Sequence, residues 1–530
     1  MQLPIPVRSN QIRPVGFLRR HLDRPVSRNL TLGVQVLILL ASVVLSVNAP
    51  TNIDGTYLAL CIWMVLSIVA LQFVYRATGP SPVNWLSIDI VAMLPMLIIH
   101  FTIPLYLVLD KLPYEERLIF ASAQGGDTKG VVCFATMMSV SAIAAFAVGF
   151  NLLPDRFALM KPSARTDTIY WRRWRVVGIR TIIIAAISGV ILLAILGPES
   201  LKGRYSGSDT GHQGLNYLLM GSNMVFLAGL ALVCTSTFVL YRSIFRLGPV
   251  FIVVAVYIAA FLIHGDRDLP FTSAAVVGLA YAEHKKRLSF RFFVLAIITG
   301  SLAYSIFGIA RNSPERSAKS MVREVINSKD QLTWDRTLNM LGTQVRILYA
   351  AVNYIPKEHD FFYGKMKAPA VIGAIPWGNR ILFTHLWLRY EGVHEKDSAT
   401  FLTWVFIEYA GDFGAGTTNV ADIYIDFGYS GVIFCLFCFG ALTKYVQQKA
   451  RSSGTMVWNS AYCFMMPMAA TSARATIISG TLRSVGWPTF VVLFLGVIFS
   501  INRCRASTRR VVNVHPGNAL PTSGSAPAAR

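Results

Sequence analysis

The sequence predicts an all-α polytopic membrane protein with about 12 transmembrane helices and a large periplasmic loop subdomain between spans nine and ten. Hydrophobic residues make up 54% of the 530 residues and charged residues only 14%, a balance too apolar for a soluble chain of this length. About a dozen apolar runs approach the roughly 20 residues that a helix needs to cross a bilayer. Between these runs, loops rich in lysine and arginine alternate with loops that have few.

The apolar runs place the spans in chain order. We expect them at 29–49, 56–75, 85–109, 130–150, 176–197, 216–241, 248–264, 270–283, 291–310, 423–443, 457–474 and 485–502. The seventh and eighth are short and could be tilted or re-entrant. The regions are then a basic N-terminus at 1–28, spans one to nine at 29–310, the loop subdomain at 311–422, spans ten to twelve at 423–502, and a basic tail at 503–530 that is expected to be disordered.

The basic segments predict the orientation. The N-terminus, the loops around Arg173, Lys286 and Lys449, and the tail belong on the cytoplasmic side of a bacterial inner membrane. These segments fall on one side only if twelve spans are present. Both termini are therefore expected in the cytoplasm, and 311–422 in the periplasm.

Charge and motifs exclude several classes of function. The net charge of +22 would suggest nucleic acid in a soluble protein, but here basic residues flank membrane spans, where orientation and anionic lipids account for them. Nearly all the cysteines lie inside apolar runs, which excludes a disulfide framework. No phosphate-binding glycine loop, no HExxH and no paired CxxC motif occurs, and the single CxxC, Cys435 to Cys438, lies in an apolar run with no histidine nearby. We therefore expect no cofactor, no metal and no nucleic-acid partner.

The long segment 311–422 is the expected place for chemistry, because a loop of this size is rarely structureless. Apolar residues at helical spacing from Leu332 to Ile355 predict one or two helices on the membrane surface. The apolar run at 398–410 could enter the bilayer partway.

A first candidate site lies at the external mouth between the seventh and eighth spans, where His264, Asp266, Arg267 and Asp268 occur together. An arginine presents a planar fork of donors that suits phosphate or carboxylate, so Arg267 is a candidate catalytic residue. The alternative is a solvated loop in which the two aspartates neutralise Arg267.

A second candidate is the run 375–380 with His385 and Arg389 behind it. Cations, an aromatic ring and potential bases close together suit a sugar and a pyrophosphate. We expect Arg380 and His385 to be catalytic and Trp377 and Arg389 to bind substrate. Alternatively, these residues merely solvate an exposed loop.

A third candidate is the glycine- and threonine-rich run 414–434. Residues 417–419 can cap the helix that follows, with Asp422 in its first turn. Capping alone could explain this run. Asp422 and Asp426 nevertheless enter the bilayer there, where an ionised carboxylate needs a partner, so Asp422 is a candidate catalytic residue.

Further arginines complete the expected site. With Arg267 they would line a positively charged external cavity that suits an anionic lipid-linked substrate, and they are Arg311, Arg346, Arg474 and Arg483. Snorkelling to lipid headgroups is the alternative.

Three local patterns between residues 220 and 500 have counterparts in a known family. They are Gly265-Asp266-Arg267 at a span mouth, Ile375, Pro376 and Arg380 in the large loop, and Gly416, Thr417, Asp422, Tyr424, Phe427 and Gly428. In these patterns and in their order the chain resembles the Wzy-type oligosaccharide repeat-unit polymerases, which make O-antigen and exopolysaccharide. It departs from them in having Asp422 where glutamate is more usual and Trp377-Gly378-Asn379 before Arg380.

The resemblance implies periplasmic glycosyl transfer. A growing glycan on undecaprenyl pyrophosphate is the donor, and the hydroxyl of a new lipid-linked repeat unit attacks its anomeric carbon and displaces lipid pyrophosphate. Arginines would stabilise the leaving group without metal or nucleotide, and Tyr424 would contact the substrate. Besides the lipid-linked oligosaccharide and the bilayer, the implied partners are a chain-length regulator and a flippase.

Two other classes remain open. A lipid-linked oligosaccharide flippase would also be polytopic and basic, but it should carry internal repeats, which we do not find. An O-antigen ligase or a membrane acyltransferase shares the arginines, a histidine and the large loop, and the sequence separates it poorly from a polymerase.

Overall fold

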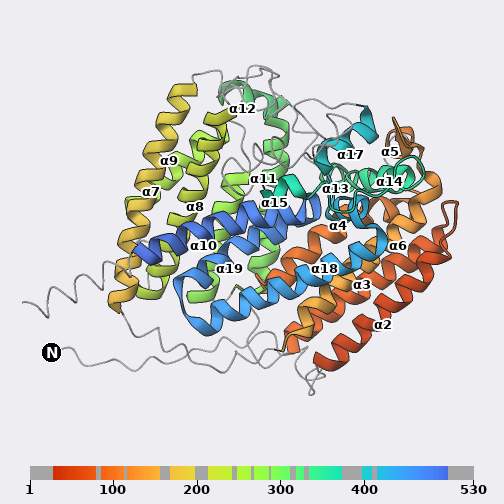
Figure 1. Ribbon diagram of the computed structural model, residues 1–530, viewed down its shortest axis with the longest axis horizontal. Coiled ribbons are helices and arrows are strands. Elements are labelled where there is room, and N and C mark those ends of the chain that lie inside the picture. The colour runs from red at the N-terminus through yellow and green to blue at the C-terminus, as the bar shows by residue number, and fades with distance from the viewer. Residues whose placement is uncertain are drawn as a thin grey trace, which may run out of the picture.

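The protein is an assembly of long helices, seen here in a computed structural model (Figure 1). The structure describes residues 28–78, 85–112, 116–154, 168–196, 213–241, 248–263, 268–285, 288–310, 318–327, 334–372, 397–408 and 415–498. Within these ranges a helix occupies each of the twelve positions predicted for a span. The prediction of an all-α polytopic membrane protein is therefore confirmed.

One group of helices surrounds α6 (Val132–Leu152), which is buried along almost its whole length. Its neighbours are α2 (Arg28–Val47), α3 (Gly55–Thr78), α4 (Ile88–Val108) and α18 (Asn419–Ser453). Helix α18 therefore returns, late in the chain, to pack among the first spans (Figure 1).

A second group holds the middle of the chain. Helix α8 (Gln213–Leu240) packs along α7 (Thr168–Leu196), with α9 (Val250–Ile263) beside them. Helices α10 (Asp268–His284) and α19 (Met456–Thr471) lie between the two groups, because α19 contacts α4, α8, α10 and α18. Helix α11 (Phe290–Ala310) packs against α12 (Ala318–Asn327).

Eight helices of the described residues are long and apolar enough to cross a membrane. They are α2, α3, α4, α6 with η1 (Lys129–Val131), α7, α8, α18, and the helical stretch Ile477–Ile498 that begins with α20 (Ile477–Thr481) and the π-helical turn η9 (Leu482–Gly486). The helices at the other four predicted spans are α9, α10, α11 and α19. Of these, α9, α10 and α19 are shorter than the eight, and the apolar stretch of α11 is described over Phe290–Gly300. A count of twelve crossings thus stays a prediction.

Short elements gather at one end of the bundle (Figure 1). They are α5 (Glu116–Phe120), α13 (Trp334–Gly342), α14 (Val345–Tyr354), α15 (Ala368–Ile372), α17 (Ser398–Ile407), and the two-residue antiparallel strands β1 (Ala121–Ser122) and β2 (Gly126–Asp127). Backbone amides of Ala123 and Gln124 donate to the carbonyls of Phe406 and Val405 on α17. The segment between α4 and α6 and the predicted loop subdomain therefore form one layer.

Two helices, α13 and α14, lie where the apolar spacing from Leu332 to Ile355 predicts one or two. Helix α14 does not lie free on a surface, because its residues from Ile347 to Val352 are buried against α17 and α18. Its polar residues Arg346 and Asn353 lie seven positions apart on one face, and the apolar residues on its other sides are buried within protein.

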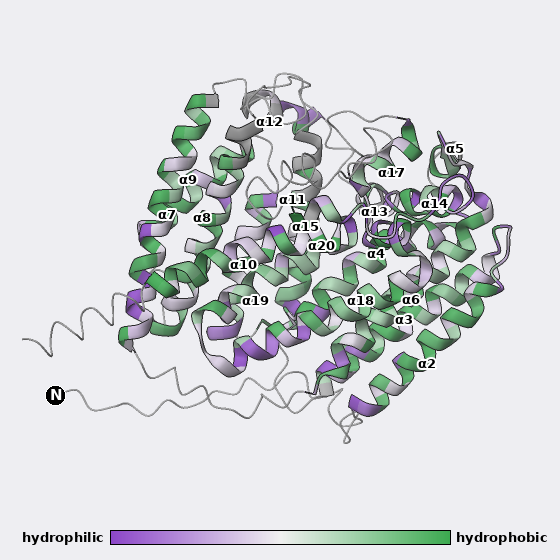
Figure 2. Ribbon diagram, in the orientation of Figure 1, coloured by the Kyte–Doolittle hydropathy of each residue, from purple (hydrophilic) through white to green (hydrophobic). Residues whose placement is uncertain are grey.

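The basic helix ends lie at the opposite end of the bundle from this layer. Figure 2 shows hydrophilic stretches at the starts of α2 and α7 and towards the end of α18, on the far side of a mostly hydrophobic middle. Basic residues in these stretches are Arg28, Arg172, Arg173, Arg175, Lys444, Lys449 and Arg451.

Two glycines permit the close crossing of α6 and α18. A β-carbon on Gly149 would overlap the backbone oxygen of Phe437, and one on Gly440 would overlap that of Phe146. Backbone atoms cannot move aside as a flexible side chain could. Small residues at such crossings let helices approach closely in membranes.

We therefore expect Gly149→Ala and Gly440→Ala each to lower the free energy of unfolding by on the order of 1–3 kcal/mol, the usual cost of overpacking. The matched control is Gly33→Ala on α2, where an added β-carbon meets nothing within 4 Å. Thermal unfolding of the purified protein in detergent measures the difference. Equal melting temperatures for all three variants would contradict the close crossing.

Candidate functional site

The candidate site is built on the first nine residues of α18, which form a short helix of their own. Thr418 is the N-cap, and its hydroxyl accepts a hydrogen bond from the amide of Ala421 at 3.1 Å. Gly428 then leaves the helical conformation with φ +65° and ψ −164°, a region that favours glycine. The predicted capping by residues 417–419 is confirmed at Thr418, and Asp422 lies in the first turn.

Asp422 and Asp426 stand one turn apart on this short helix and share a single cation, the ammonium of Lys367. Its nitrogen lies 2.5 Å from Oδ1 of Asp422 and 2.8 Å from Oδ2 of Asp426. Both aspartates are fully buried and Lys367 is nearly so. Lys367 is thus the partner that the sequence analysis expects for the two carboxylates.

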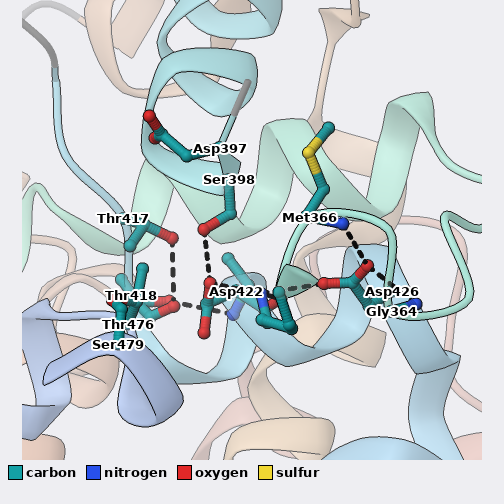
Figure 3. A network of polar contacts seen from close by, with 12 residues as sticks. Gly364, Met366, Asp397, Ser398, Thr417, Thr418, Asp422, Asp426, Thr476 and Ser479 are labelled. Atoms are coloured by element: carbon teal, nitrogen blue, oxygen red, sulfur yellow. Dashed lines mark hydrogen bonds and ion pairs between the residues drawn. The ribbon is translucent and has the colours of Figure 1, made fainter. Parts of the chain in front are cut away.

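Other donors fix the two carboxylates in place (Figure 3). Amides of Gly364 and Met366 donate to Oδ1 of Asp426 at 3.0 and 3.3 Å. The hydroxyl of Ser398, at the start of α17, donates to Oδ1 of Asp422. The pair of aspartates thus joins segment 364–367 and α17 to α18.

The second oxygen of Asp422, Oδ2, is buried and has no hydrogen-bond partner among the described residues. Figure 3 shows it without a dashed line, beside the oxygen that meets Ser398. A buried carboxylate oxygen without a donor is costly.

Burial lowers the pKa of Lys367, but the charges of Asp422 and Asp426 raise it more, so the net pKa lies above the ordinary lysine value. A raised folded-state pKa means that the ion pair stabilises the protein fully below the ordinary lysine pKa. That stability is lost only as the pH rises through the raised value. Lys367 is therefore charged at neutral pH.

Two more predicted site residues, Arg346 and Arg474, lie on elements that contact α18. Arg346 on α14 has its guanidinium 4.5 Å from the ring centre of Phe406, and burial lowers its pKa. Its Nε is buried without a partner in the described part of the chain. Arg474, in the 3₁₀ turn η8 (Ser472–Arg474), is exposed, and η8 contacts both α4 and α18.

Two predicted substrate-binding residues, Tyr424 and Arg483, do not contact Asp422 through their side chains in the described structure. Tyr424 is buried, and its hydroxyl donates to the backbone oxygen of Ile355 at 3.1 Å. Arg483 is exposed in the π-helical turn after α20. A substrate-binding role for either stays a prediction.

The remaining predicted site residues lie outside the described residues. They are Arg267, Arg311, Trp377, Arg380, His385 and Arg389. Of the first candidate cluster, the structure describes only Asp268, which is exposed at the start of α10.

The sequence interpretation missed Lys367 and Ser398. Lys367 lies 55 residues before Asp422, in a stretch without helical spacing, and nothing local marks it as the partner. The sequence gives only an indirect signal for a basic partner. Asp422 and Asp426 stand one helical turn apart at the edge of a predicted span, where ionised carboxylates need a countercharge.

Comparison with known proteins matches the chain to a family. The model of a family described as O-antigen polysaccharide polymerase Wzy matches residues 215–506, a region that contains every residue of the Asp422 site. No curated protein and no solved structure matches the chain.

Proposed function

The chain belongs to the O-antigen polysaccharide polymerase Wzy family, whose model covers more than half of it, and from this membership we propose the reaction, the donor and the side of the membrane. The family and the apolar helices make the protein a multi-pass bacterial membrane enzyme that polymerises O-antigen repeat units. We propose that the donor is the growing glycan on undecaprenyl pyrophosphate. The acceptor is a second lipid-linked repeat unit, and transfer takes place at the periplasmic face of the inner membrane.

In the proposed step, the acceptor hydroxyl oxygen forms a bond to the anomeric carbon of the donor. The bond from that carbon to the pyrophosphate oxygen breaks, and lipid pyrophosphate leaves with the electron pair. We assign the hydroxyl proton to Oδ2 of Asp422. The observation that supports this assignment is a rigidly held carboxylate with one unpartnered oxygen.

Arginines would neutralise the departing pyrophosphate, because guanidinium groups donate in pairs to phosphate oxygens. Arg346 and Arg474 are the described candidates, since α14 and η8 both pack against α18. The same role is proposed for the predicted arginines outside the described residues, with His385 as a further acid or base and Trp377 as a sugar contact. Because guanidinium charge suffices, the reaction needs neither metal nor nucleotide.

The orientation of the protein is part of the proposal. Basic ends of α2, α7 and α18 lie opposite the layer that holds the site, and basic ends stay in the cytoplasm. A reporter fused after Lys357 is therefore expected to read as periplasmic and one after Lys449 as cytoplasmic. A cytoplasmic reading at Lys357 would place the site on the wrong side.

The reaction itself is tested with purified protein and lipid-linked repeat units extracted from a strain that lacks this gene. We expect a ladder of longer glycans in the presence of a metal chelator and without any nucleotide sugar. Addition of a single glycan to a different acceptor would indicate a ligase. Movement of the substrate across vesicles without lengthening would indicate a flippase.

A further inference from the structure

A second set of buried polar side chains lies between α4, α14 and the start of α18. His100 on α4 and Asn419 on α18 are fully buried, with His100 Nε2 3.4 Å from Asn419 Oδ1. Gln344, on the two-residue turn between α13 and α14, is also buried, and its Oε1 lies 4.0 Å from the position of a β-carbon on Gly416. The start of α18 thus has polar neighbours on two sides.

The end of α13, two residues before Gln344, packs directly against α4. A β-carbon on Gly342 would lie 2.6 Å from Cβ of Thr102, so only glycine allows this approach. Thr102 is two residues from His100 on the same helix. Because Pro104 has no N–H, it cannot donate to the carbonyl of His100 four residues earlier.

Each member of this set has an atom without a partner. Nδ1 of His100, Nδ2 of Asn419 and Oε1 of Gln344 are buried, and none of them makes a hydrogen bond to any described residue. Leaving one such group unsatisfied costs about 1–3 kcal/mol. Three such atoms lie near the start of α18, the helix that also carries the unpartnered Oδ2 of Asp422. Because buried polar groups are normally hydrogen-bonded, these atoms indicate a ligand site.

The chemistry of these atoms identifies the ligand class. The amide nitrogen donates, the amide oxygen accepts, and an imidazole nitrogen does either according to its tautomer. A phosphate only accepts and would be repelled by Gln344 Oε1. A sugar hydroxyl both donates and accepts, so a neutral set of mixed donors and acceptors suits carbohydrate.

We propose that His100, Gln344 and Asn419 form a subsite that binds hydroxyl groups of the repeat-unit sugar. The inference rests on the proposed function, because Asn419 and Asp422 are three residues apart and so neighbours on one helix face. His100 lies outside the region 215–506 that the family model matches. The subsite therefore joins a residue from outside the family region to the acidic helix within it, an arrangement suited to selecting the sugar.

The test separates sugar binding from lipid binding. Two probes are used with the full-length protein in nanodiscs: undecaprenyl pyrophosphate without sugar, and the lipid-linked repeat unit extracted from a strain lacking this gene. The variants are His100→Leu and Gln344→Met, which remove the polar atoms and keep the approximate volume. The control is Asn151→Leu, which removes a buried amide bonded to Gln35 and Gln72 at the other end of the bundle.

We expect the wild type to bind the repeat-unit lipid more tightly than the sugar-free lipid. In His100→Leu and Gln344→Met this preference should fall by on the order of tenfold, the size of one lost hydrogen bond, with unchanged affinity for the sugar-free lipid. Asn151→Leu should melt at a lower temperature and keep the preference. A wild type without preference, or unchanged preference in both variants, overturns the subsite.

The outcomes also separate this inference from the proposed function. A wild-type protein that builds no ladder while its sugar preference depends on His100 would refute polymerisation and leave the subsite standing. A wild-type protein that builds the ladder while both variants keep full preference would refute the subsite alone.

Discussion

Lys367→Met is expected to destabilise the protein by on the order of 3–5 kcal/mol, the cost of removing one partner of a buried ion pair. The lysine is the cation that Asp422 and Asp426 share, so its loss leaves two buried carboxylates without a countercharge. The hydrogen bonds from Gly364 to Asp426 and from Ser398 to Asp422 would remain, but they do not supply a countercharge. Thermal unfolding in detergent and the amount of protein inserted in the membrane measure the effect.

The control for this prediction is the triple variant Lys367→Met, Asp422→Asn, Asp426→Asn. It removes every charge of the cluster, and replacement of a whole buried ionic group by neutral residues is often tolerated. It should therefore recover much of the stability that the single variant loses. A single variant as stable as the wild type would show that the three charges do not interact as their distances indicate.

The fold was largely predictable because its signals are local. Apolar length and spacing placed a helix at each of twelve positions, and they located α13 and α14 within the long segment. The N-cap at Thr418 was predictable from a threonine followed by an acidic first turn. The break in the helix at Gly428 was harder to predict, because a glycine within an apolar run can also continue the helix.

The site was predictable only in part because its contacts join distant segments. Asp422 stood out by its depth in the membrane, whereas Lys367 and Ser398 reach it from a loop and from another helix. His100 lay in a run read only as a span. His100 became a candidate only because its Nδ1 is buried without a partner among the described residues. That burial depends on the packing of α4 against α18, which the sequence does not reveal.

Asp422→Asn is expected to lower the rate of polymerisation by about 10²–10⁴-fold, the usual contribution of a general base. The substitution keeps the shape of the side chain and an oxygen to accept from Ser398 and Lys367, but an amide nitrogen replaces the unpartnered Oδ2 that would take the proton. Folding should be little affected, because the cluster of one lysine and two aspartates carries one excess negative charge that this change removes.

Asp426→Asn is the matched control, because it removes the same charge from the same lysine. Oδ1 of Asp426 accepts from the amides of Gly364 and Met366. Its Oδ2 lies 2.8 Å from the ammonium of Lys367, so a positive charge opposes transfer of a substrate proton to it. We expect this variant to polymerise within about tenfold of the wild type, well above the range for loss of a general base. The measurement is the initial rate of ladder formation by equal amounts of folded protein. Equal losses in the two variants, in proportion to their loss of stability, would make Asp422 a structural anchor and move the base to another residue.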